Sequence, residues 1–93
     1  MTTFTQTDTN NLNGSHLQGV VTVDYQKLVK IFGEPERFSG DGKTTVEWDI
    51  EFDDGTVASI YDWKEWVQAE AVTQWHVGGF SAKALARVVE ALA

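Results

Sequence analysis

The sequence contains no cysteine, so it can form neither a disulfide framework nor a thiolate site. It also contains no apolar run that approaches the ~20 residues needed to cross a membrane. Its beginning has neither the basic start nor the apolar block of a secretory signal. We therefore expect a soluble domain in a reducing, cytoplasmic compartment.

Basic residues are scarce, with seven Lys and Arg against 14 Asp and Glu and a net charge of −7 over 93 residues. Such a charge repels the phosphates of nucleic acids and anionic membrane surfaces, so neither is expected as a direct partner. Residues 41–70 hold nine acids and two lysines, whereas the remainder of the chain is electrically neutral. The acidity is therefore predicted to form one located surface, suited to a basic protein or a cationic small ligand.

The chain is rich in apolar residues (42%) and has four tryptophans, which is typical of a globular domain. Residues 46–52 alternate apolar with acidic side chains, so they predict a strand with one apolar and one carboxylate face. The turn at 53–55 predicts a hairpin with two registers. A two-residue turn would place Val57 and Ser59 on the face of Trp48, whereas a three-residue loop would place Ala58 and Ile60 there. The second is favoured because Asp-Gly suits a type I turn followed by a left-handed glycine.

The remaining helices and strands are predicted from residues typical of helix ends. A strand over 19–23 precedes a helix over 25–32, with Asp24 as N-cap and Gly33 in the left-handed position after it. A further strand over 74–77 precedes a helix that Ser81 caps and that runs through Leu92. Residues 63–72 are ambiguous between helix and extended chain.

This order of elements, β-α-β-β-β-α, has no crossover helices between successive strands. It predicts an α+β fold with an antiparallel sheet of about four strands and two helices packed on one face. Residues 1–16 have too few apolar side chains to bury and are expected to be a flexible N-terminal tail. Residues 17–93 are then a single domain, small enough that a homodimer would be a natural supplement to its core.

No catalytic residue, metal site or cofactor is predicted. His76 lies on a strand, where it fits a partly exposed structural histidine. An enzyme that uses His76 with Asp62 or Asp49 is the least favoured hypothesis. The acids alternate along a strand and lack the loop of an EF-hand.

The surface predicted to bind a partner protein combines acids with exposed tryptophans, which together favour a basic surface. Its residues are Glu47, Asp49, Glu51, Asp53, Asp54, Asp62, Trp63, Glu65 and Trp66. The alternative is that the acids are a solvated face that discourages aggregation and that the tryptophans pack under the sheet.

A second hypothesis places a small ligand at the turn before the last helix, whose free amides can receive an anion. Its residues are His76, Gly78, Gly79, Ser81 and Arg87. A nucleotide-like signal, sequestered by an oligomer, is the ligand expected there.

Three segments, LQGVVTVDYQKLVKIFGEP (17–35), TVEWDIEFDDGTVASIYDWK (45–64) and WHVGGFSAKAL (75–85), resemble a family of small bacteriophage and prophage proteins. The chain departs from that family within 64–72, where WVQAEAV replaces a more glycine-rich loop. The resemblance implies a non-enzymatic accessory protein that binds and inhibits a host protein, such as a defence complex, in the host cytoplasm.

Overall fold

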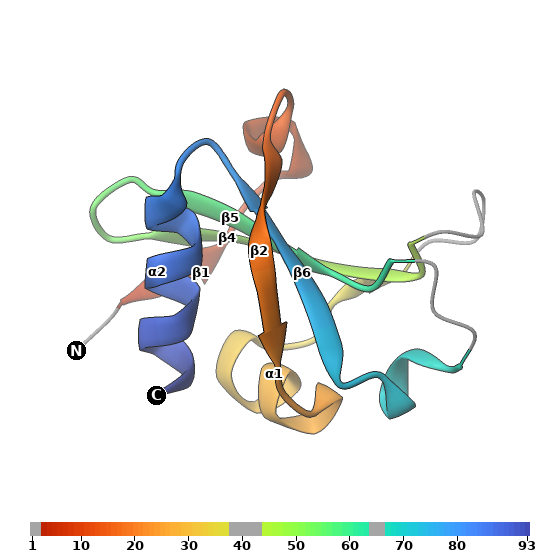
Figure 1. Ribbon diagram of the computed structural model, residues 1–93. Coiled ribbons are helices and arrows are strands. Elements are labelled where there is room, and N and C mark those ends of the chain that lie inside the picture. Colours follow the sequence, from red (N-terminus) through yellow and green to blue (C-terminus); the bar gives the residue numbers. More distant parts are fainter. Residues whose placement is uncertain (1–2, 38–43, 64–66) are drawn as a thin grey trace.

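The computed structural model describes residues 3–37, 44–63 and 67–93, which form an α+β fold with a six-stranded antiparallel sheet and two α-helices (Figure 1). The strands are β1 (Phe4–Gln6), β2 (His16–Thr22), β3 (Glu36–Arg37), β4 (Val46–Phe52), β5 (Val57–Tyr61) and β6 (Gln74–Gly79). The helices are α1 (Tyr25–Phe32) and α2 (Ala82–Leu92), with 3₁₀ turns η1 (Thr9–Leu12) and η2 (Ala69–Ala71). The predicted class is confirmed, and the strand number is corrected from about four to six.

The strands follow the order β1-β4-β5-β6-β2, and β3 pairs with β4 beside this path. The sheet is strongly twisted, so that β2 and β6 run crosswise to β4 and β5 in Figure 1. In the β4–β5 hairpin, Trp48 pairs with Ile60 and Ile50 pairs with Ala58. Gly55 has a φ of +88°, which a side chain would strain. The three-residue-loop register is therefore the one that forms.

The apolar face of the sheet packs against both helices and forms the core. Trp48 and Trp75 are at most 1% exposed, and their rings meet edge to face at 5.4 Å. Each indole is satisfied by a backbone carbonyl, since Trp48 Nε1 donates to Gly33 O at 2.7 Å and Trp75 Nε1 donates to Val23 O at 3.0 Å. Full burial of such a side chain stabilises the fold by about 2–3 kcal/mol. These two tryptophans are structural.

Two glycines of the sheet face helix α2. A Cβ atom on Gly79 would lie 2.3 Å from Ala84 Cβ, and one on Gly19 would lie 2.7 Å from Leu85 Cδ2. A side chain on Gly79 would displace the helix, because Ala84 Cβ is fixed to its backbone, whereas one on Gly19 would require the Leu85 side chain to move. Gly79 is thus a packing residue.

Residues 3–16 belong to the folded domain, which corrects the expectation of a flexible tail for this part of 1–16. Phe4 pairs with Phe52 in the sheet, and its ring lies 4.9 Å from the ring of Phe32. The Gln6 side chain donates to Phe32 O at 2.7 Å, and Leu12 in η1 is 7% exposed. A few apolar anchors and backbone pairing are enough to fix this polar segment.

The helix bounds match their predicted signals, with one exception. Helix α1 spans Tyr25–Phe32, but the side chain of Asp24 makes no capping hydrogen bond within the described chain, which corrects its predicted role. Ser81 does cap α2, because its Oγ accepts from Lys83 N at 3.3 Å. Of the described residues, none forms a helix long and apolar enough to cross a membrane.

Candidate functional site

The sheet face opposite the core carries two neighbouring rows of polar residues. Cross-strand pairing places Glu36, Glu47, Tyr61 and His76 in one row over β3, β4, β5 and β6. The adjacent row contains Asp49, Ser59 and Gly78. Because side chains alternate along a strand, every member of both rows projects away from the core. The register of the hairpin therefore assembles this polar face.

A pocket of about 280 Å³ opens on this face, and it is lined among others by His16, Glu47, Ser59, Tyr61, Trp63 and Gly78. A Cβ on Gly78 would lie 2.6 Å from Ser59 Oγ, so a larger residue at this position would crowd Ser59 at the pocket wall. Leu12 of η1 also lines the pocket. A concave site with aromatic walls and a few polar groups is the usual form of a small-ligand site.

The acids of this face perturb one another. The pKa of Glu47 is raised from 4.5 to about 8, first by burial, then by its hydrogen bond with Asp49 and by the charges of Asp49 and Glu36. Glu47 is therefore largely protonated at neutral pH. Asp49 is 5% exposed, and its Oδ1 has no hydrogen-bond partner among the described residues. A buried acceptor left unpaired is costly, and this one stands beside the pocket-lining Glu47 and Ser59.

Aromatic rings form one wall of the site. The ring of Tyr61 stacks on His76 at 5.6 Å and meets the ring of Trp63 edge-on at 6.3 Å. Burial and the neighbouring Glu47 raise the pKa of Tyr61, so its hydroxyl stays protonated. Trp63 is 39% exposed and remains accessible to a ligand.

The residues of the predicted partner surface do not share one environment. Asp62 is 1% exposed and accepts from Thr45 N at 2.8 Å, Val46 N at 3.0 Å and Thr45 Oγ1. It is a structural residue, which corrects its assignment to the exposed acidic surface. Asp49 is likewise buried, so it cannot contact a protein directly.

The turn acid Asp54 is also engaged within the chain. Its carboxylate lies 2.8 Å from Arg87 Nη2 and 3.0 Å from Lys83 Nζ. Hydrogen bonds from Thr56, Arg87 and Lys83 hold the pKa of Asp54 well below its usual range. Glu51 and Asp53 are exposed, whereas Glu65 and Trp66 lie outside the described residues.

The predicted anion-binding set is divided by the fold. His76 and Gly78 lie on the polar face with the pocket, whereas Gly79 packs under α2 and Ser81 caps it. Arg87 is held by Asp54 and Glu90. The turn before α2 thus does not assemble the predicted site. The hypothetical His76 pair with Asp49 or Asp62 is not formed through Nδ1, which has no hydrogen-bond partner in the described part of the chain.

Sequence reasoning missed Ser59, Tyr61 and the rim residue His16 as site residues. The signal for the first two was present, since the favoured register already placed Ser59 and Tyr61 on the face of Glu47 and Asp49. His16 carried no such signal, because a pairing with β6 across 63 residues brings it to the pocket.

Comparison of the chain with protein-family models, curated proteins and solved structures gives no match. Over residues 3–37, 44–63 and 67–93, no group of three or more His, Asp or Glu side chains could hold a metal ion.

Proposed function

We propose that this chain is a non-enzymatic binding protein whose pocket on the polar face takes a small organic ligand. The observation that carries the proposal is the half-buried Glu47, hydrogen-bonded to the buried Asp49, beside the rings of Tyr61 and Trp63 that line the pocket. Binding without catalysis is proposed because the described residues provide no carboxylate at His76 Nδ1, and the carboxylate of Asp62 is committed to the fold.

A ligand screen by thermal shift and two-dimensional NMR tests this proposal. The panel contains amines, amino acids, sugars, nucleosides and nucleotides. A ligand of this pocket should raise the melting temperature by mass action and move the Tyr61 and Trp63 signals. Its effect should be lost in Tyr61→Leu and retained in Glu34→Gln, which changes an exposed acid distant in sequence from the pocket. Binding that survives Tyr61→Leu and maps elsewhere would contradict the proposal.

A second candidate function is binding and inhibition of a basic host protein in the host cytoplasm, as the phage-family resemblance implies. The exposure of Glu51, Asp53 and Trp63 favours it, since aromatic and acidic groups are then available to lysines and arginines. A pull-down from bacterial lysate at low and high salt tests it. Capture should weaken with salt and in Glu51→Lys and Asp53→Lys, but not in the matched control Glu34→Lys. Salt-independent capture that survives both substitutions would remove this candidate.

We also propose that the protein forms a homodimer in which β2 of one copy pairs with β2 of the other. Strand β2 pairs with β6 on one side and ends the order of described strands. Residues 16–22 carry no Asp, Glu, Lys or Arg, and Leu17 and Val20 are 56% and 45% exposed. An uncharged free edge can pair with a second copy. Sedimentation should show a dimer that Val20→Lys dissociates.

A further inference from the structure

We propose that the ligand of the polar-face pocket is a small organic cation, an amine, amidine or guanidine on a flat apolar group, and that its binding expels a proton from Glu47. This inference rests on the proposed pocket function and narrows it to one chemical class.

The charges around the pocket favour a cation. Glu47 and Asp49 lie two residues apart on β4, and Glu36 is the cross-strand neighbour of Glu47 on β3. Among the described residues that line the pocket, none is lysine or arginine. Within the described residues, a phosphate or carboxylate would therefore meet negative charge that no lining cation offsets, whereas a cation would be attracted.

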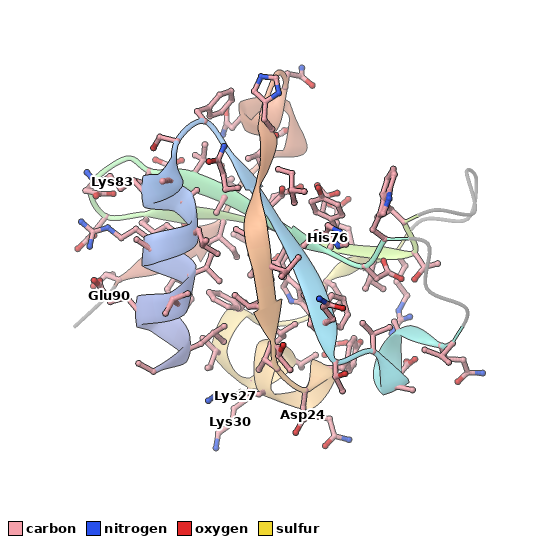
Figure 2. The ribbon with its side chains drawn as sticks, viewed as in Figure 1. Asp24, Lys27, Lys30, His76, Lys83 and Glu90 are labelled. Atoms are coloured by element: carbon pink, nitrogen blue, oxygen red, sulfur yellow. The ribbon has the colours of Figure 1, made fainter. Side chains whose placement is uncertain are left out.

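The protein's own described cations are held elsewhere. Figure 2 shows Lys27 and Lys30 on α1 and Lys83 on α2, all well separated from His76 on the polar face. Arg37 contacts Glu70 at 3.1 Å and Arg87 contacts Asp54 at 2.8 Å, so both guanidinium groups are engaged. The cation that would complete the Glu47–Asp49 pair is thus not one of these five side chains.

Asp49 is hydrogen-bonded to the pocket-lining Glu47 and adds negative charge there without lining the pocket itself. Its Oδ1 is buried and lacks a hydrogen-bond partner within the described residues, although the side chain as a whole is bonded to Glu47. An amidinium or guanidinium group presents parallel N–H donors at the spacing of carboxyl oxygens. One such group can bond both oxygens of the ionised Glu47 carboxylate, and the neighbouring charge of Asp49 strengthens the attraction.

The aromatic wall of the pocket indicates the shape and polarity of the uncharged part of the ligand. Tyr61 and Trp63 present ring surface beside the carboxyl groups, and a flat apolar group can pack there with its charge near the rings. A volume of about 280 Å³ is at the small end for ligand pockets, so it favours one ring with a short substituent.

Proton release follows from the environment of Glu47. Its proton is held by burial and by the negative charges of Asp49 on β4 and Glu36 on β3. Tyr61 on β5 borders it, His76 on β6 lies behind Tyr61, and His16 stands at the pocket rim. A bound cation stabilises the ionised Glu47, so the neutral carboxyl becomes a carboxylate and its proton passes to the buffer. Affinity should therefore rise with pH up to the free-state pKa of about 8 and then level off.

The experiment uses benzamidine, its neutral isostere benzamide and the anion benzoate as probes. Titration calorimetry at pH 7 in two buffers of different ionisation enthalpy counts the protons, and NMR maps the contact. Benzamidine should bind at the Tyr61 and Trp63 signals, at least about tenfold more tightly than benzamide, and should release up to one proton. Glu47→Gln and Asp49→Asn should each weaken benzamidine roughly tenfold, whereas Glu34→Gln should not.

Two further results show which group releases the proton and which class of ligand the pocket binds. If the affinity of Glu47→Gln for benzamidine no longer changes with pH, the inference is supported. If the pH dependence survives, the released proton comes from a histidine and the proposed proton release from Glu47 is overturned. Preference of the pocket for benzamide or benzoate in the wild-type protein overturns the cation class but keeps the pocket function. Absence of any probe at Tyr61 and Trp63 overturns the cation class, and only failure of the whole ligand panel removes the pocket function too.

Discussion

Two buried aspartates of the same sheet have opposite surroundings. Asp62 follows β5 and is 1% exposed, and its carboxylate accepts from two backbone amides and one hydroxyl. Asp49 lies in the middle of β4 and is 5% exposed, yet its Oδ1 has no partner within the described residues. Equal burial thus accompanies a satisfied acid in one region and an unsatisfied acid in the other.

This difference distinguishes an aspartate that stabilises the fold from one that we assign to the functional site. A buried carboxylate with a full set of donors holds the chain together, and Asp62 ties the start of β4 to the end of β5. A buried carboxylate with a missing donor costs free energy, which proteins tolerate at functional sites and offset elsewhere in the fold. The following changes test that distinction, beginning with the largest expected effect.

Replacement of Asp62 by alanine should lower the free energy of unfolding by about 2–4 kcal/mol, because Thr45 N and Val46 N lose their acceptor. Urea denaturation followed by tryptophan fluorescence measures the change. A loss of under about 1 kcal/mol would show that water replaces the carboxylate, and the contrast with Asp49 would fail.

The unfolding free energy of the wild-type protein should fall as pH rises from about 5 to about 8. The folded-state pKa of Glu47, about 8, lies above its ordinary value of 4.5, so the stabilisation is complete below 4.5 and is lost through 8. We expect a loss of about 1–2 kcal/mol, after allowance for the solvent that reaches this half-buried carboxyl. Denaturation across this range should show a flatter profile for Glu47→Gln. Equal slopes would assign the pH dependence to other groups.

Replacement of Asp49 by asparagine should leave stability within about 1 kcal/mol of wild type or raise it, because it removes a buried charge and keeps an oxygen that accepts from Glu47. The same urea series measures this variant. A loss as large as that of Asp62→Ala would mean that Asp49 is structural and would remove the contrast between the two acids.

The smallest effect is expected at the β4–β5 turn, where Asp54 meets Arg87 and Lys83 at the surface. Arg87→Ala should lower the melting temperature by no more than about 2 °C, and less at high salt, because exposed ion pairs are screened by solvent and ions. A larger, salt-independent change would show that the Arg87 stem packs against the fold.

Much of the scaffold could be predicted because its signals are local. The bounds of α1, the Ser81 cap and the hairpin register follow from residues a few positions apart, and all three are confirmed. Strand β1 could not be found in this way, since three residues carry little pattern and Phe4 is fixed by its contact with Phe52. The site was predicted in part. The alternation of β4 shows in the sequence that Glu47 and Asp49 share one face, but nothing in the sequence shows how deeply each is buried.

The sequence by itself determined the alternation of β4, the turn at Gly55 and the excess of acid within 41–70, because each depends on neighbouring residues. Tertiary structure alone decided which acids face solvent, ion pairs or the interior. A carboxylate's state depends on the atoms within a few ångströms of it, and segments distant in sequence supply many of them: α2 for Asp54, the start of β4 for Asp62, and β3 for Glu47.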